Sequence, residues 1–294
     1  MKQSKAEIYV LLAGVFWGSM GVFVRVLNAA GLYAMDIVQA RMLSGLLFVG
    51  GNMLLFARDK FRIRLRDLWC FLGTGCVSIL IFSWCYFSGM QETSLSVMGV
   101  LLYTSPAVIM VLSIILFHEK LTKAKLLALF MTFAGCCLVS GLGSDASVSL
   151  KGLLLGLGAG FFYALYSIFS RFAIDRGYSS WTITFYTFLF CLLASAPLAH
   201  WGLIASALSS GVSVPVYALL MGLLTGFLAY IFYTKGLEGM ESSRAGILAS
   251  VEPVVGTIIG TLVFHEPLPV QSVLGIALVL GGIVVLGGKK VSKA

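Results

Sequence analysis

The chain has 294 residues, of which 59% are hydrophobic and 11% are charged, and its mean hydropathy is +1.00. Soluble domains carry roughly 25% charged residues, and a soluble globule of this length has too little interior to hide so much apolar surface. Composition therefore excludes a soluble domain and favours an integral protein of the lipid bilayer. The formal net charge of +8 does not indicate nucleic acid. The basic residues lie in short clusters between apolar runs, where they orient membrane helices.

Ten segments are long and apolar enough to span a membrane as helices, since a span needs about 20 residues. In chain order they are residues 7–27, 34–57, 68–88, 96–117, 124–142, 152–173, 180–200, 215–235, 243–264 and 270–288. The stretch between the fifth and sixth segments, residues 141–149, is rich in Gly and Ser and reads as a connector. The fold predicted from these segments is an all-α integral membrane protein.

An internal repeat divides the ten segments into two sets of five. Pro106 precedes an apolar run that ends in Phe-His-Glu at residues 117–119, and Pro253 precedes one that ends in Phe-His-Glu at residues 264–266. Both features recur at a spacing of 147 residues, and self-similarity at a fixed spacing marks a repeat. We therefore expect two related halves, residues 1–143 and 144–294. In a membrane protein, such a repeat is typical of a transporter with its site between the halves.

Loop charge predicts how each half crosses the membrane. Basic residues crowd alternate loops and the end of the chain: Arg58, Lys60, Arg62, Arg64, Arg66, Lys120, Lys123, Lys125, Arg171, Arg176, Lys235, Arg244, Lys289, Lys290 and Lys293. By the positive-inside rule, these loops and both termini are cytoplasmic. Because five is an odd number, the second half must enter the membrane in the opposite sense to the first. The expected architecture is therefore an inverted repeat.

Short motifs give the chain a family resemblance. They are Phe16-Trp17-Gly18 in the first segment, Arg41 in the second, Ser105-Pro106 and Glu252-Pro253 at equivalent depths of the fourth and ninth, and the two Phe-His-Glu turns. With these motifs, the two five-helix halves resemble the drug/metabolite transporter superfamily, and most closely its EamA (RhaT-like) family with ten spans. The resemblance covers essentially the whole chain.

This resemblance implies a carrier in the plasma (inner) membrane that moves a small metabolite, such as an amino acid or amine, by alternating access. Such carriers are often exporters. The two halves are not chemically interchangeable, because Thr187 stands at the repeat position of Arg41 and Ser105 at that of Glu252.

Glu252 is the first candidate for a substrate site. A charge within a span costs roughly 2.5–3.5 kcal/mol on insertion scales, so a retained carboxylate needs a reason. Pro253 has no N–H, so a carbonyl group one turn earlier lacks its helical hydrogen bond. Inside a membrane, backbone with an unpaired carbonyl is tolerated only where it packs against protein or lines a cavity. Removal from water would favour the neutral carboxyl, so Glu252 is also a candidate proton carrier. The alternative is a structural carboxylate held by a neighbouring helix.

Arg41 and several neutral residues complete the predicted substrate site. The guanidinium of Arg41 could hold a carboxylate or phosphate, pair with Glu252, or serve folding. Gln39 could add a hydrogen bond. Tyrosines inside spans carry hydroxyl groups that need partners, which favours a cavity wall over a lipid-facing surface. The predicted aromatic members are Trp17, Tyr86, Tyr103, Tyr163, Tyr166, Tyr230 and Tyr233. An aromatic cavity with a carboxylate suits a cationic or zwitterionic amine.

Other chemistries are less well supported by the sequence. The two His-Glu pairs lack the second His four residues on that zinc metalloproteases need, because Thr122 and Pro269 stand there. We expect no metal, no cofactor and no enzymatic activity, and the oligomeric state stays open. The alternatives are a polytopic enzyme acting on a lipid-type substrate, or a channel or structural membrane subunit. A proton or substrate gradient is the expected energy source.

Overall fold

The computed structural model describes residues 3–141 and 149–287, and every regular element within them is helical. Ten helical segments in this part are long and apolar enough to cross a membrane, and they match the predicted spans within a few residues. The chain is thus an all-helical, multi-pass membrane protein. The expected boundary between residues 143 and 144, and Lys289, Lys290 and Lys293, lie outside the described residues.

Helices of the first five spans are joined by short turns. The spans are built from α1 (Gln3–Gly18) with α2 (Met20–Ala29); α3 (Ala34–Phe56); α4 (Leu68–Leu72), the π-helix η3 (Gly73–Leu80) and α5 (Ile81–Gly89); α6 (Leu95–Leu102) with α7 (Ser105–Phe117); and α8 (Lys123–Ser140). Two short 3₁₀-helices, η1 (Arg58–Phe61) and η2 (Leu65–Asp67), connect α3 to α4.

The second five spans repeat this order with one addition. They are α9 (Leu150–Asp175); α10 (Ser180–Ser195) with the 3₁₀-helix η4 (Ala196–Leu198); α12 (Ser213–Met221), the π-helix η5 (Gly222–Leu228) and α13 (Ala229–Leu237); α14 (Ser242–Ala249) with α15 (Glu252–Phe264); and α16 (Val270–Gly287). The short helix α11 (Trp201–Ser209), which the sequence did not predict, lies between the seventh and eighth spans.

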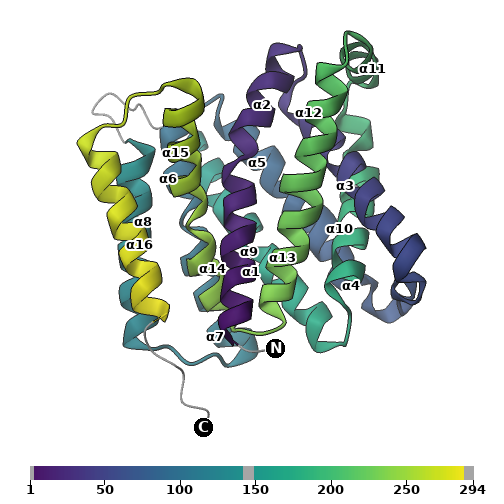
Figure 1. Cartoon of the computed structure of the whole chain (residues 1–294). Helices are drawn as coiled ribbons and strands as arrows, with labels where there is room; N and C mark the ends of the chain where they lie inside the picture. Colours follow the sequence, from purple (N-terminus) through teal and green to yellow (C-terminus); the bar gives the residue numbers. More distant parts are fainter. Residues whose placement is uncertain (1–2, 142–148, 288–294) are drawn as a thin grey trace.

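The two ends of the bundle differ in which segments they carry. Gln3 and Gly287 lie at one end, here called the terminal end, and α11 lies at the other, here called the distal end (Figure 1). Side-chain oxygens cap the N-termini of several helices. Those of Ser94, Thr122, Ser149 and Ser179 accept hydrogen bonds from backbone N–H groups three residues later.

Two spans at equivalent places of the repeat are broken within the bilayer-crossing segment. α6 gives way to α7 at Tyr103 and Thr104, and α14 gives way to α15 at Ser250 and Val251. The second residue of each following half-helix is proline, Pro106 or Pro253, which has no N–H for a continuous helix. The break expected from Pro253 is confirmed. Broken helices of this kind often carry the binding sites of transporters.

The same two spans end in the same way. α7 ends at Phe117 and α15 ends at Phe264, and the next residues, His118 and His265, have left-handed backbones with φ of 54° and 53°. Glu119 and Glu266 then donate their N–H groups to carbonyl oxygens six residues earlier. This is the geometry of a helix C-terminal cap. The two His-Glu pairs therefore mark the C-terminal ends of α7 and α15.

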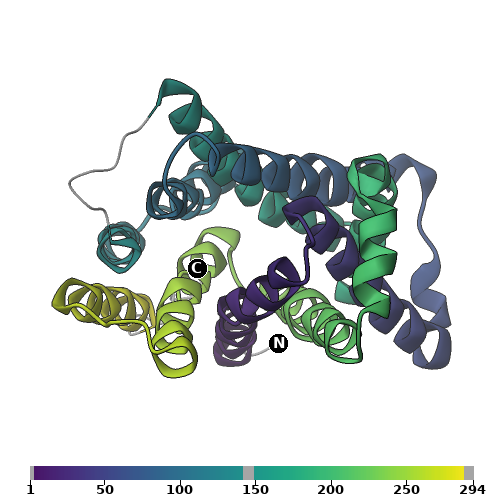
Figure 2. The same cartoon turned by 90° about the horizontal axis from the view of Figure 1, so that it is seen from above.

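Glycine lets α8 and α16 cross at close range at one edge of the bundle (Figure 2). A Cβ on Gly135 would lie 2.6 Å from the carbonyl oxygen of Gly275, and a Cβ on Gly282 would lie 3.0 Å from that of Ala128. At the repeat spacing, Gly282 corresponds to Gly135 and Gly275 to Ala128. In the first contact α8 supplies the glycine and α16 the carbonyl oxygen, and in the second contact the two helices are reversed. This exchange is consistent with an inverted repeat, and small residues permit the close approach.

Candidate functional site

Four of the predicted aromatic residues form one cluster in the middle of the bundle. Trp17 of α1 lies 5.4 Å from Tyr230 and 5.1 Å from Tyr233 between ring centroids, and Tyr166 of α9 lies 5.1 Å from Tyr230. All four side chains are at least nine-tenths buried. Tyr230 and Tyr233 share one face of α13, because residues three apart on a helix are neighbours. The structure thus brings together Trp17, Tyr166, Tyr230 and Tyr233, here called the aromatic cluster.

A small cavity borders the aromatic cluster. Its lining residues are Trp17, Ser78, Ile79, Phe82, Tyr163, Tyr166, Ser167, Tyr230 and Tyr233. They come from both predicted halves. The space open to the centre of a water molecule is about 20 Å³, which suffices for about one ordered water. A metabolite does not fit in this conformation, so binding one requires the surrounding helices to move apart.

Glu252 lies at the edge of this cavity. It is the first residue of α15, directly after the break, where helix N–H groups favour a negative charge. Tyr163, which lines the cavity, donates a long hydrogen bond of 3.4 Å from its hydroxyl to Oε2 of Glu252. Gly18 lets α1 approach closely, since a Cβ there would lie 2.6 Å from the carbonyl oxygen of Glu252. Glu252 therefore faces α1 through its backbone and α9 through its carboxylate.

Arg41 is buried on α3 without a carboxylate partner. Its side chain is 5% exposed, Nη1 lies 2.9 Å from the sulfur of Met20, and Nε has no hydrogen-bond partner. Within the described residues, neither Arg41 nor Glu252 takes part in an ion pair. Met20 lies about one helical turn beyond Trp17, so Arg41 is near the aromatic cluster but outside the cavity wall. Its guanidinium retains free donors for an anionic group.

Three other predicted residues lie farther from the cavity or already have partners. Gln39 donates to the carbonyl of Leu192 at 3.2 Å and accepts from the hydroxyl of Ser195, so it joins α3 to α10. Tyr86 does not line the cavity but contacts Phe82 of its wall, with ring centroids 5.8 Å apart. Tyr103 packs against the buried cluster of Cys136, Val254 and Val279. A role for these three residues in substrate binding stays a prediction.

The predicted site did not include four residues of the cavity wall, Ser78, Ile79, Phe82 and Ser167. Phe82 lies four residues before Tyr86 and therefore shares its helical face, a signal that was available. Ser78 and Ile79 belong to the π-helix η3, whose wider turn changes which side chains face the cavity. No feature of the sequence predicts that turn. In residues 3–141 and 149–287, no group of three or more His, Cys, Asp or Glu residues could hold a metal ion.

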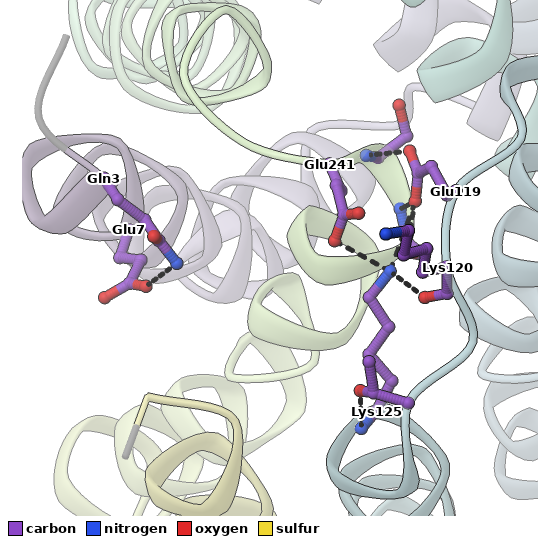
Figure 3. A network of polar contacts seen from close by, with 9 residues as sticks. Gln3, Glu7, Glu119, Lys120, Lys125 and Glu241 are labelled. Carbon is purple, nitrogen blue, oxygen red and sulfur yellow. Dashed lines mark hydrogen bonds and ion pairs between the residues drawn. The ribbon is translucent and has the colours of Figure 1, made fainter. Parts of the chain in front are cut away.

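A buried polar network joins the two predicted halves at the terminal end (Figure 3). Glu119, next to the α7 cap, accepts hydrogen bonds from the N–H groups of Ser242 at 2.6 Å and Ser243 at 3.2 Å, and from the Ser243 hydroxyl. Lys125 lies 2.8 Å from Glu241 and 3.7 Å from Glu119. Glu119 and Lys125 are both more than nine-tenths buried. We refer to the bonds of Glu119 with Ser242 and Ser243 as the terminal contact.

The repeat counterpart of Glu119 makes a different contact at the distal end. Glu266 forms an ion pair with Arg25, whose guanidinium also lies 4.2 Å from the ring centroid of Phe264. These two side chains are 51% and 44% exposed, unlike the buried network at the other end. The Arg25–Glu266 pair, here called the distal contact, also joins the two predicted halves. Each copy of the Phe-His-Glu turn thus holds the halves together at one end.

Comparison with known proteins identifies a family and a fold. The sequence matches the EamA-like transporter family twice, over residues 4–141 and 150–288. It is 26% identical to the uncharacterized transporter YwfM of Bacillus subtilis (strain 168), covering 97% of this chain and 95% of that one. It is 28% identical to an uncharacterized transporter of Archaeoglobus fulgidus, covering 95% of each chain.

One crystal structure has the same fold at 18% sequence identity, with a TM-score of 0.77 over 97% of this chain and 96% of the other.

Proposed function

The chain belongs to the EamA-like transporter family, and on that premise we propose that it is a secondary active transporter of a small metabolite, such as an amino acid or amine. The observation that carries this proposal is the position of Glu252. This carboxylate begins the half-helix α15 inside a span and is linked through Tyr163 to a cavity lined by tyrosine and tryptophan. An intramembrane carboxylate at a helix break is costly to keep and typical of a substrate or ion site.

Two charged groups near the aromatic cluster define the proposed substrate class. Aromatic faces and a carboxylate together attract an ammonium group, and tyrosine hydroxyls add hydrogen bonds. The unpaired guanidinium of Arg41 is suited to a carboxylate or phosphate on the same substrate. Glu252 is also the proposed proton carrier, because a carboxyl group that exchanges between a buried site and water can carry a proton across. Export is the proposed direction and rests on the family alone.

Alternating access is the proposed mechanism. The cavity holds about one water, so substrate must enter through an opening at one end and leave at the other. The terminal and distal contacts join the halves at these two ends. Breaking one while keeping the other would expose the cavity to a single side of the membrane. We propose a carrier and not an enzyme or a channel. Saturable counterflow is the property that distinguishes a carrier from those two alternatives.

A ligand screen with a matched variant tests the role of Glu252. Purified protein is screened by thermal shift against amino acids, amines, nucleobases and sugars, and each compound that stabilises it is then tested for counterflow in proteoliposomes. Glu252→Gln keeps the shape of the side chain and is expected to reduce counterflow at least tenfold and to change its pH dependence. Glu92→Gln is the control, because Glu92 lies in the turn after α5 and pairs with Lys151 at the start of α9, away from the cavity.

Unchanged counterflow and pH dependence in Glu252→Gln would refute the role proposed for Glu252. Flux that does not saturate and shows no counterflow would refute a carrier mechanism.

A further inference from the structure

The loop between α3 and α4 forms a surface at the terminal end, on the side of the bundle opposite α16 (Figure 2). Side chains of the α9–α10 connection and of the start of α10 hold it. The Tyr178 hydroxyl donates to Oδ2 of Asp67 at 2.7 Å and accepts from the N–H of Arg64 at 3.0 Å. Farther along, Thr182 donates to the carbonyl oxygen of Lys60 at 2.9 Å. The basic side chains of this loop are therefore presented on a fixed backbone.

Two adjoining hollows of about 350 and 300 Å³ open on this surface. Arg64 and Arg176 line both, Arg66 and Trp69 line the first, and Lys60 and Arg62 line the second. Five basic and two acidic side chains in their walls leave a net charge of +3. Hollows of this size and charge suit a phosphate group with a small polar head.

Three of the arginines in these walls have no carboxylate partner. Nζ of Lys60 lies 2.9 Å from Oδ2 of Asp59, so Asp59 neutralises this lysine. The hydrogen bond from Lys60 also holds the pKa of the Asp59 carboxyl below its usual value. Arg176 pairs with Asp67 at 3.3 Å. For the other three, Arg62, Arg64 and Arg66, the structure gives no ion pair within the described residues, and all three are exposed. Their unneutralised charge is available to an anion.

Apolar side chains beside the arginines indicate that this anion belongs to a lipid. Leu65, between Arg64 and Arg66, is 86% exposed, and the third span begins at this residue. Trp69 follows one turn later, 41% exposed, with the guanidinium of Arg176 4.9 Å from its ring. The first hollow thus lies where the charged loop meets the apolar surface of a span. Tryptophan and arginine at that depth are typical of the headgroup region of a bilayer.

We propose that these hollows form a binding site for an anionic phospholipid, with its phosphate held by Arg64 and Arg66 and an acyl chain against Leu65 and Trp69. Free phosphate has the same anionic chemistry but no group to cover the apolar side chains. Phosphate contacts of this kind depend on the guanidinium fork, which binds two phosphate oxygens at once. The site lies apart from the aromatic cluster, so it is independent of the transported substrate.

The test is a titration of purified protein in detergent with dioleoyl phosphatidylglycerol, dioleoyl phosphatidylcholine or inorganic phosphate, followed by thermal unfolding. We expect phosphatidylglycerol to raise the unfolding temperature at lower concentrations than phosphatidylcholine does. Arg64→Gln/Arg66→Gln is expected to raise the half-saturating concentration of phosphatidylglycerol about fivefold for each arginine removed. Lys120→Gln/Lys123→Gln removes two charges from another loop at the same end and is expected to leave it unchanged.

Each other outcome overturns the proposal. Equal effects of the two lipids would mean that the headgroup charge is not recognised. If the lysine variant raised the half-saturating concentration of phosphatidylglycerol as much as the arginine variant does, the effect would be due to net charge and not to a specific site. Full stabilisation by inorganic phosphate alone would identify free phosphate as the ligand. If the double variant does not fold, Arg66→Gln is used alone, since the structure shows no side-chain partner of Arg66 in the described residues that folding would lose.

Discussion

At the scale of single residues, His118 and His265 have backbone conformations that L-residues adopt only at a cost. Their φ values of 54° and 53° place both in the left-handed region, which costs about 1–2 kcal/mol for a side chain with a Cβ. Both side chains are exposed. Glycine is the usual residue at this capping position because it has no Cβ. The shared histidines therefore serve the turn that ends each helix.

This geometry predicts opposite effects of two substitutions. His118→Gly is expected to stabilise the protein by up to about 1 kcal/mol, because relief of strain exceeds the added entropy of the unfolded chain. His118→Val is expected to destabilise it by about 1–2 kcal/mol, since a β-branched side chain tolerates positive φ poorly. Thermal unfolding in detergent measures both, and the same pair at His265 should give the same signs. Lys120, which has no positive φ, is the control position.

If Lys120→Gly stabilised the protein as much as His118→Gly, backbone strain would not be the cause.

Sequence reasoning found the residues of the site where local spacing is informative. Tyr166, Tyr230 and Tyr233 were predicted members of the site, and they do meet across α9 and α13. The partners of Glu119 could not be predicted in this way. Its carboxylate binds the first N–H groups of α14, more than 120 residues later in the chain. Such a contact depends on which helix end packs opposite the turn, and local sequence does not encode that choice.

At the scale of helices, proline is the residue that marks where a span is broken. The breaks before α7 and α15 follow from Pro106 and Pro253, whereas the interruption at Ser19 between α1 and α2 has no proline to signal it. The π-helices η3 and η5 were likewise not predictable, because an i→i+5 turn depends on packing more than on composition. Local rules thus gave the number and bounds of the spans but not all of their internal irregularities.

The terminal and distal contacts differ in burial, which predicts unequal effects of breaking them. Loss of a buried charged partner costs about 3–5 kcal/mol, whereas an exposed pair is worth at most about 1 kcal/mol. Glu119→Gln is therefore expected to open the terminal end substantially. Glu266→Gln is expected to open the distal end only slightly. The reporter is Ser78→Cys in the cavity wall, in a background without the native cysteines.

An impermeant thiol reagent added to either side of proteoliposomes measures this opening. Glu119→Gln should raise the labelling rate of residue 78 from the terminal side, and Glu266→Gln should raise it less and from the distal side. Gln91 lies in the loop after α5, and Gln91→Ala serves as a control that alters neither contact. Faster labelling from the same side in both glutamate variants would contradict the assignment of one contact to each end.

At the scale of the whole molecule, the family match over residues 4–141 and again over 150–288 agrees with two halves of one ancestry. Their proposed inversion has a structural correlate in the exchanged contacts of α8 and α16. It also explains why one motif serves opposite ends. The Phe-His-Glu turn of the first half lies at the terminal end and that of the second half at the distal end, and each makes a contact between the two predicted halves.

The inverted arrangement predicts the side from which each connection is accessible. Arg62, in the basic loop after α3, and Ser209, at the end of α11, are both exposed and lie at opposite ends of the bundle (Figure 1). With the native cysteines replaced, Arg62→Cys is expected to react with an impermeant maleimide only after the cell membrane is opened. Ser209→Cys is expected to react in intact cells. The physical reason is that basic loops are retained in the cytoplasm.

Two further positions make this labelling specific to the inversion. Lys120→Cys, beside the first Phe-His-Glu turn, should behave like Arg62→Cys, and Leu268→Cys, just after the second turn, should behave like Ser209→Cys. A chain whose halves inserted in the same sense would place residues 120 and 268 on one side. Equal labelling of those two positions in intact cells would therefore exclude an inverted repeat, whatever the behaviour of residues 62 and 209.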